Sequence, residues 1–203
     1  EIEGQGAGAI IADENGELLI LTEKKTISKA ERISVTFIND AVAEAELKKY
    51  DGNTGIAILS VDKSQLDSAT LSAITVAQIG NSNTVSKGQI VIALGSPLGT
   101  SYSILSGSIT SRGNEITTLD NNYSVFTTDI VGSKNGSGIL IDVNGEIVGL
   151  IMQDYSSAGA SNTLTAVAIS GVSELLNLLM AGEDIPYLGI SGTTVTDKIA
   201  DKY

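Results

Sequence analysis

The sequence contains no histidine, so it lacks both the commonest general base near neutral pH and the commonest zinc ligand. It also contains no cysteine, which excludes disulfides, thiolate metal sites and cysteine nucleophiles. No apolar run reaches the roughly 18 residues that a membrane-spanning helix requires. These absences exclude several classes of enzyme, and we expect no cofactor.

Positive charge is also scarce, because 12 basic residues face 24 acidic ones and the net charge is −12. Nucleic acids and anionic lipid surfaces are polyanions, so neither is expected as a partner. Acidic turns are present at Asp13–Gly16 and Asp142–Gly145. Neither has the further acidic positions of a calcium loop, and we therefore expect ordinary turns and no metal site.

The chain does contain many short runs typical of β-strands. Turn sequences such as Glu14-Asn15-Gly16 and Val143-Asn144-Gly145 separate them. This spacing predicts an antiparallel barrel or sandwich. The predicted strands are Gly8–Ile11, Leu18–Thr22, Ile33–Ile38, Gly55–Val61, Ile90–Leu94, Ser103–Thr110, Ser124–Thr128, Gly138–Ile141, Ile147–Met152 and Thr163–Ala168.

One amphipathic helix is predicted, over Ser170–Met180. Val172, Leu175, Leu176 and Leu179 share one face, and Gly182 follows as a stop signal. We expect this helix to pack on a barrel.

The order of several motifs resembles the HtrA/Deg-type trypsin-like serine proteases over nearly the whole chain. Gly6–Ile11 is similar to the Gly-rich opening strand of the family. Gly95-Ser96-Pro97-Leu98-Gly99 is similar to its Gly-Asn-Pro-Phe-Gly signature. The matching segments are Gly6–Ile11, Leu21–Ile27, Tyr50–Leu59, Gly88–Gly99, Ser106–Ile109 and Thr127–Asp129.

The resemblance implies an all-β, trypsin-like double six-stranded β-barrel with a C-terminal helix and an active-site cleft between the barrels. Residues 1–76 would form the N-terminal barrel, and residues 77–182 the C-terminal barrel with the helix at 170–180. Residues 183–203 would be a linker and the start of a truncated PDZ-like domain. By the same resemblance, Tyr187, Leu188, Gly189 and Ile190 match the PDZ loop that binds a peptide carboxylate.

The catalytic triad of the family is degenerate in this chain. Lys25 stands where the resemblance places histidine, and Gly55 stands where it places aspartate. Counting forward from Thr128-Asp129 puts Ser137 at the nucleophile position, whereas counting back from Asn144-Gly145-Glu146 puts Gly136 there. We favour Ser137, because Gly138 follows it in the family's Ser-Gly order, but both assignments stay open.

The oxyanion-like turn of the family corresponds to Lys134, Asn135, Gly136 and Ser137. The residue two places before the nucleophile is Asn135 on one count and Lys134 on the other, where the family has glycine. The degenerate triad predicts a catalytically inactive site. The alternative is an active serine endopeptidase that uses a non-standard Ser137–Lys25 dyad. Such a lysine must be neutral near pH 7, which needs a pKa about 3 below its ordinary value.

We therefore expect an inactive HtrA-like pseudoprotease that binds peptide or protein segments, with an edge strand near Leu150–Met152 as one place for strand addition. The resemblance implies an extracytoplasmic or cell-surface role in quality control or signalling, with a preceding membrane anchor. The family often forms homo-oligomers through segments before the first strand. A purely structural domain that spaces an anchor from a PDZ domain is a third alternative.

Overall fold

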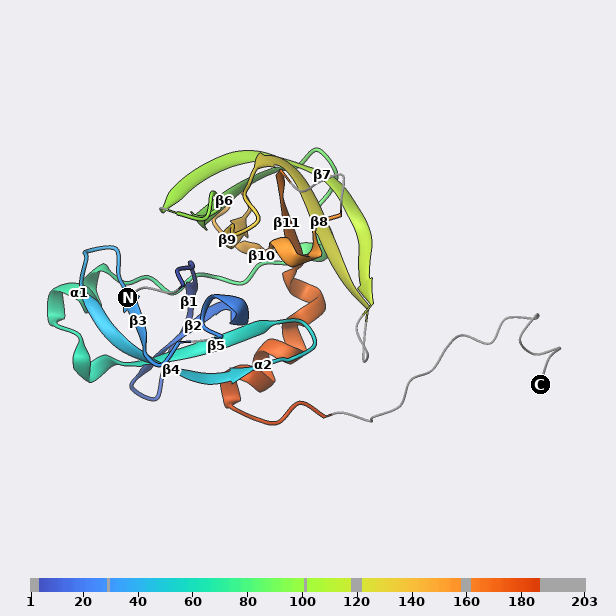
Figure 1. The fold of residues 1–203 in the computed structure, drawn as a ribbon. Helices are drawn as coiled ribbons and strands as arrows, with labels where there is room; N and C mark the ends of the chain where they lie inside the picture. Colours follow the sequence, from blue (N-terminus) through green and yellow to red (C-terminus); the bar gives the residue numbers. More distant parts are fainter. Residues whose placement is uncertain (1–3, 29, 101, 118–121, 158–161, 187–203) are drawn as a thin grey trace, which may run out of the picture.

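The computed structural model describes residues 4–28, 30–100, 102–117, 122–157 and 162–186. Nearly half of these residues lie in two antiparallel sheets, which pack against each other with a C-terminal helix beside them (Figure 1). The expected all-β, trypsin-like architecture with a C-terminal helix is confirmed.

The N-terminal sheet has the strand order β1-β2-β5-β4-β3. Asn15 and Gly16, both with positive φ, form the tight β1–β2 turn that the Asn-Gly pair predicts. The strands are β1 (Ala9–Glu14), β2 (Glu17–Glu23), β3 (Ile33–Thr36), β4 (Val42–Tyr50) and β5 (Ile56–Asp62). The short helices that accompany them are η1 (Lys24–Thr26), η2 (Lys63–Gln65) and α1 (Ser68–Ala73).

The C-terminal strands close into a barrel with the order β10-β11-β8-β7-β6-β9. They are β6 (Ile90–Ser96), β7 (Ser103–Thr117), β8 (Asn122–Val131), β9 (Ser137–Ile141), β10 (Ile147–Met152) and β11 (Thr163–Ala168). Three short 3-10 turns accompany them: η3 (Ser82–Thr84) precedes β6, η4 (Gln153–Tyr155) connects β10 to β11, and η5 (Ile169–Val172) follows β11.

The two halves share a hydrophobic core. One core fills the N-terminal sheet, one fills the barrel, and a third joins Leu21 and Ile56 of the first half to Leu150 and Met152 of the second. Strands β2 and β5 therefore face apolar neighbours on both sides. This is why they are nearly continuously buried and read as unbroken aliphatic runs in the sequence.

The predicted C-terminal helix is confirmed as α2 (Ser173–Ala181). Its first predicted turn is the 3-10 segment η5, so the α-helix begins three residues later than expected. Leu175, Leu176 and Leu179 are buried in the shared core, against which α2 packs. Gly182 adopts φ +70° and its N–H closes the helix on the carbonyls of Leu178 and Leu179, as the stop signal predicts.

Two details of the sequence prediction are wrong. In the described residues the N-terminal sheet has five strands, not six. The segment beside β1 makes a single backbone bond to it, from Ala77 N–H to the Ile10 carbonyl, and does not continue as a ladder. The expected edge at Leu150–Met152 is also absent, because β10 pairs with β9 on one side and β11 on the other.

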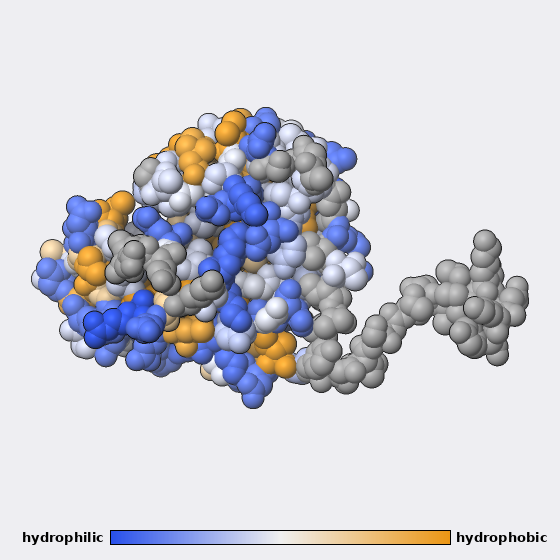
Figure 2. All heavy atoms as spheres, viewed as in Figure 1, coloured by the Kyte–Doolittle hydropathy of each residue, from blue (hydrophilic) through white to orange (hydrophobic). Residues whose placement is uncertain are grey.

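The face of the molecule in Figure 2 is mostly hydrophilic, with small separate apolar groups. This fits the net charge of −12, because charge is dispersed over the surface. In the part of the chain that the structure describes, no helix has both the length and the apolarity needed to cross a bilayer.

Candidate functional site

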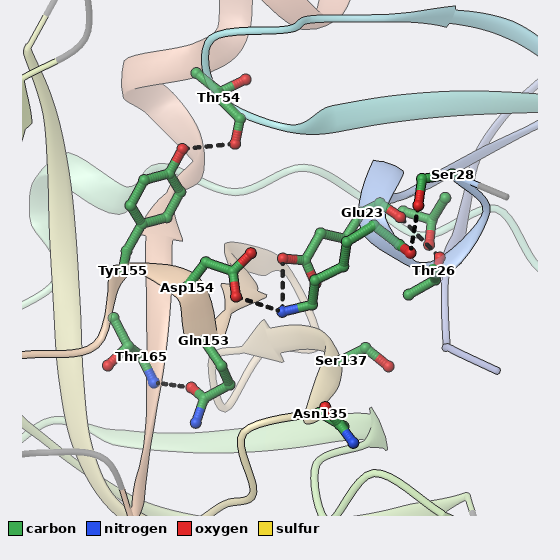
Figure 3. A network of polar contacts seen from close by, with 12 residues as sticks. Glu23, Thr26, Ser28, Thr54, Asn135, Ser137, Gln153, Asp154, Tyr155 and Thr165 are labelled. Atoms are coloured by element: carbon green, nitrogen blue, oxygen red, sulfur yellow. Dashed lines mark hydrogen bonds and ion pairs between the residues drawn. The ribbon is translucent and has the colours of Figure 1, made fainter. Parts of the chain in front are cut away.

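Lys25, at the expected histidine position, lies in η1 directly after β2. Its Nζ is 3.0 Å from Oε1 of Glu23 and 3.2 Å from Oδ1 of Asp154. Asp154, which is labelled in Figure 3, belongs to η4 of the C-terminal half, so the ion pair of Lys25 with Asp154 links the two halves. The amine therefore lies between two carboxylates, one from each half.

Glu23 is a buried acid at the end of an aliphatic strand, with a side chain only 3% exposed. Neither carboxylate oxygen accepts a well-directed hydrogen bond from the described residues, and the ion pair with Lys25 is its compensation. Burial raises the pKa of Glu23 to about 7, against the lowering effect of Lys25.

Gly55, at the expected aspartate position, closes a tight turn that begins at Asp51. The buried Asp51 carboxylate accepts hydrogen bonds from Asn53 N, Thr54 N and Thr54 Oγ1. Gly55 N–H then donates to the Asp51 carbonyl at 3.0 Å, and Gly55 adopts φ +80°. The turn is thus built for glycine, because side-chain-bearing residues rarely adopt this conformation.

Tyr155 ties the same turn to the C-terminal half. Its hydroxyl donates to the Thr54 carbonyl at 2.7 Å (Figure 3). Burial raises the pKa of the Tyr155 phenol, and the nearby Asp51 carboxylate adds to that effect. The two halves, between which a trypsin-like protease has its active-site cleft, are therefore bridged twice. One bridge is the Lys25–Asp154 ion pair, and the other is the Tyr155–Thr54 hydrogen bond.

Ser137, the favoured nucleophile, is the first residue of β9 and is only 1% exposed. Its Oγ accepts a hydrogen bond from the Ala7 N–H at 2.9 Å. In Figure 3 its hydroxyl points away from the Asp154 carboxylate. Among the hydrogen bonds of the described residues, none joins Ser137 to Lys25. The structure thus places the two members of the alternative dyad in separate contacts.

The oxyanion-like turn is held by Ser133, the residue directly before it. The Gly136 N–H donates to the Ser133 carbonyl at 2.9 Å, and the Asn135 N–H donates to Ser133 Oγ at 3.2 Å. A Cβ on Gly136 would lie 2.5 Å from the Pro97 carbonyl oxygen, so this position excludes any side chain without rearrangement. Lys134 lies in the same turn and is exposed.

The remaining candidate residues, Tyr187, Leu188, Gly189 and Ile190, lie outside the described residues. Among the residues that are described, no three Asp or Glu side chains come together in a way that could hold a metal ion.

Sequence reasoning missed four participants: Ala7, Glu23, Asp154 and Tyr155. Ala7 contributes only its backbone N–H, and no sequence pattern reports that. Asp154 and Tyr155 are more than 100 residues from their partners Lys25 and Thr54. Only Glu23 carried a signal, because it extends the unbroken run Leu18–Thr22, which is typical of a strand buried on both faces.

Comparison with known proteins agrees with this geometry. The family described as "Trypsin-like peptidase domain" matches residues 6–150. The chain is 28% identical over 207 residues to a "Probable periplasmic serine endoprotease DegP-like" of Pseudomonas savastanoi pv. phaseolicola, covering 100% of this chain and 41% of that protein. It is also 28% identical over 200 residues to a "Serine protease Do-like HtrA" of Lactobacillus helveticus, covering 94% and 47%. The chain spans less than half the length of these relatives.

Solved structures show the same fold. The chain is similar to the "HtrA-type protease AlgW with decapeptide", with a TM-score of 0.74 and 23% identity, over 96% of this chain and 58% of that one. It is similar to the same type of protease "with tripeptide", with a TM-score of 0.73 and 23% identity, over 98% and 64%. The resemblance stated from the sequence is thereby confirmed.

Proposed function

Because the chain belongs to the trypsin-like peptidase domain family, we propose that it is a catalytically inactive, HtrA-like member that binds peptide or protein segments outside the cytoplasm. The relatives are proteases, and the proposal is that this chain keeps their framework without their chemistry. The main observation that supports it is that Lys25, at the expected histidine position, contacts the carboxylates of Glu23 and Asp154.

A general base must lie within hydrogen-bond reach of the proton that it accepts. Lys25 Nζ lies within 3.2 Å of two carboxylates, those of Glu23 and Asp154, and among the hydrogen bonds of the described residues none joins it to Ser137. The Ser137–Lys25 dyad loses support for this reason, and because the Ser137 Oγ faces the Ala7 N–H instead.

Both assignments of the nucleophile meet an obstacle. If Ser137 is the counterpart, its hydroxyl is buried and already accepts a hydrogen bond. If Gly136 is the counterpart, there is no nucleophile, and a Cβ there would meet the Pro97 carbonyl at 2.5 Å. Neither assignment therefore gives an exposed serine hydroxyl at the nucleophile position.

The oxyanion hole meets an obstacle on both assignments too. In trypsin-like sites the two donors are the backbone N–H of the nucleophile and the N–H two residues before it. With Gly136 as the counterpart, its own N–H already donates to the Ser133 carbonyl. With Ser137 as the counterpart, the second donor is Asn135, whose N–H already donates to Ser133 Oγ. On each assignment, one of the two backbone N–H donors of the oxyanion hole is therefore already hydrogen-bonded to Ser133.

Peptide binding is supported by the family context. The solved AlgW structures contain a decapeptide and a tripeptide, as their titles state. The DegP-like relatives are named periplasmic, which supports an extracytoplasmic location here. Anchoring to a membrane, a homo-oligomeric state and carboxylate binding by a PDZ-like loop at Tyr187–Ile190 remain predictions from the resemblance.

The test combines a reactivity assay with a binding assay. The chain and an active HtrA-type protease are treated with a fluorophosphonate probe and with denatured casein. The proposal expects labelling and cleavage only for the active protease, while an array of unrelated peptides retains this chain above background. Cleavage by this chain that Ser137→Ala abolishes would instead establish the dyad, and an array without any binding would favour the purely structural alternative.

A further inference from the structure

An open groove that contains two lysines lies beside the Asp51–Gly55 turn. It is lined by the end of β4, the turn after it and the segment that follows α2, and its volume is about 560 Å³. We call it the lysine groove; its residues are Leu47, Lys48, Lys49, Tyr50, Gly52, Asp184 and Ile185. Figure 1 shows α2 running beside β4 and β5 before the chain reaches this segment.

Two of the 12 basic residues of the chain line this groove, and both pair with carboxylates: Lys48 with Glu17 at 2.7 Å and Lys49 with Asp184 at 2.6 Å. Lys24 is not a lining residue, but its Nζ lies over the ring of the lining residue Tyr50, 3.4 Å from the centroid. Among the described residues Lys24 has no carboxylate partner. A cation without an acidic partner in the described residues therefore lies beside the groove, over Tyr50.

The chain itself occupies part of the groove with an acidic residue followed by an apolar one. The Asp184 carboxylate accepts a hydrogen bond from Lys49 Nζ at 2.6 Å, and Ile185 packs against the shared hydrophobic core. The Asp184 side chain is 98% exposed, and Lys49 is the partner of its ion pair among the described residues. A pair held this loosely can be exchanged for a similar one at little cost.

The apolar surface of the groove complements the second residue of that pair. Leu47 and Tyr50 are 39% and 40% exposed, which leaves apolar area beside the lysines. A segment with a carboxylate next to a branched aliphatic side chain would satisfy both features. Its carboxylate would bind Lys49, a further acidic residue would reach Lys24, and its aliphatic group would cover Leu47 and Tyr50.

We propose that the lysine groove binds a short acidic–aliphatic segment of another polypeptide, in competition with the chain's own Asp184–Ile185 segment. The proposal rests on the proposed function of peptide binding and names where one class of segment is bound. It needs no triad residue, so it is independent of whether the centre is catalytically dead.

The test uses a capped peptide with residues 181–186 of this chain, AGEDIP, titrated into the whole protein and followed by amide NMR shifts. The expected result is saturable shifts confined to residues 47–52 and 182–186. Lys49→Gln should weaken the affinity about fivefold, and the peptide in which Asp184 is replaced by asparagine should be weakened similarly. Asp184→Asn in the protein should strengthen binding about threefold, since the tethered competitor is lost.

The matched control is Lys63→Gln, which removes an equally exposed lysine from an ion pair with Asp13 elsewhere. It should leave the affinity unchanged. Shifts that spread over the surface, equal weakening by Lys49→Gln and Lys63→Gln, or no gain in Asp184→Asn would overturn the proposal. If the array of unrelated peptides binds while AGEDIP does not, the groove assignment fails and the proposed function stands; if nothing in the array binds, the proposed function itself fails.

Discussion

The amine of Lys25 lies 3.2 Å from the carboxylate of Asp154, across 129 residues of sequence. The residue that the sequence resemblance places at the histidine position of the family therefore joins the two halves of the fold here. Glu23 also contacts this amine, and its side chain is buried. The three charged residues Glu23, Lys25 and Asp154 therefore form one cluster that includes a buried acid. This arrangement has consequences for stability that can be measured.

The buried acid makes stability depend on pH in a defined window. The pKa of Glu23 is raised from 4.5 to about 7, so the folded state binds its proton more tightly than the unfolded state. The free energy of unfolding should fall as pH rises from about 4.5 to about 7, by roughly 3 kcal/mol from this group. Urea unfolding of Glu23→Gln should lack that component of the decline.

The control for this prediction is Glu46→Gln, which removes an exposed acid of the same sheet. Its unfolding curve should keep the wild-type decline between pH 4.5 and 7. If the Glu23→Gln and wild-type curves run parallel through this window, burial does not perturb Glu23 and the prediction is wrong.

Substitution of Ser137 separates a structural serine from a nucleophile. Ser137→Ala removes the acceptor of the Ala7 N–H and leaves that donor unpaired, which should cost about 1–3 kcal/mol in the free energy of unfolding. Ser72→Ala, at an exposed serine of α1, should cost less than about 0.5 kcal/mol. A Ser137→Ala variant as stable as the parent would contradict a structural role.

Restoring the triad side chains should not restore hydrolysis. Gly55 has φ +80°, a conformation that costs a residue with a side chain about 1–2 kcal/mol, so Gly55→Asp should destabilise the fold. Lys25→His combined with Gly55→Asp should still fail to react with a fluorophosphonate probe. Reaction of this double variant at the rate of an active HtrA-type protease would show that the backbone still fits catalysis.

A matched glycine in the same turn supplies the stability control. Gly52 has no positive φ and nothing within 4 Å of an added Cβ. Gly52→Ala should therefore change the midpoint of thermal unfolding little, whereas Gly55→Ala should lower it by several degrees. Equal effects of the two substitutions would refute the conformational argument.

The second bridge between the halves should contribute modestly. Tyr155→Phe removes the hydroxyl that donates to the Thr54 carbonyl at 2.7 Å, with an expected loss of about 0.5–1.5 kcal/mol. Tyr102→Phe, at a side chain that is 62% exposed, should have no measurable effect. Differential scanning calorimetry of the two variants at the same pH distinguishes these outcomes.

Local patterns in the sequence were sufficient for much of the fold. Aliphatic runs separated by Asn-Gly and Gly-rich turns predicted ten of the strands, and β10 and β11 match at both ends. Strand β4 was missed, because its sequence VAEAELKKY is rich in alanine, glutamate and lysine, which are poor strand formers. It is a strand because β3 and β5 pair with it on either side, and that contact is tertiary.

For the site, the sequence by itself determined that no histidine exists, and its resemblance to the family implies lysine and glycine at two triad positions. Only the tertiary structure decided which contacts these residues make. Lys25 meets Asp154 and Ser137 meets Ala7 across about 130 residues, because the shared hydrophobic core brings the two halves together. The aliphatic run before Glu23 indicated a buried strand, but only burial in the folded protein raises the pKa of Glu23, which pairs with Lys25.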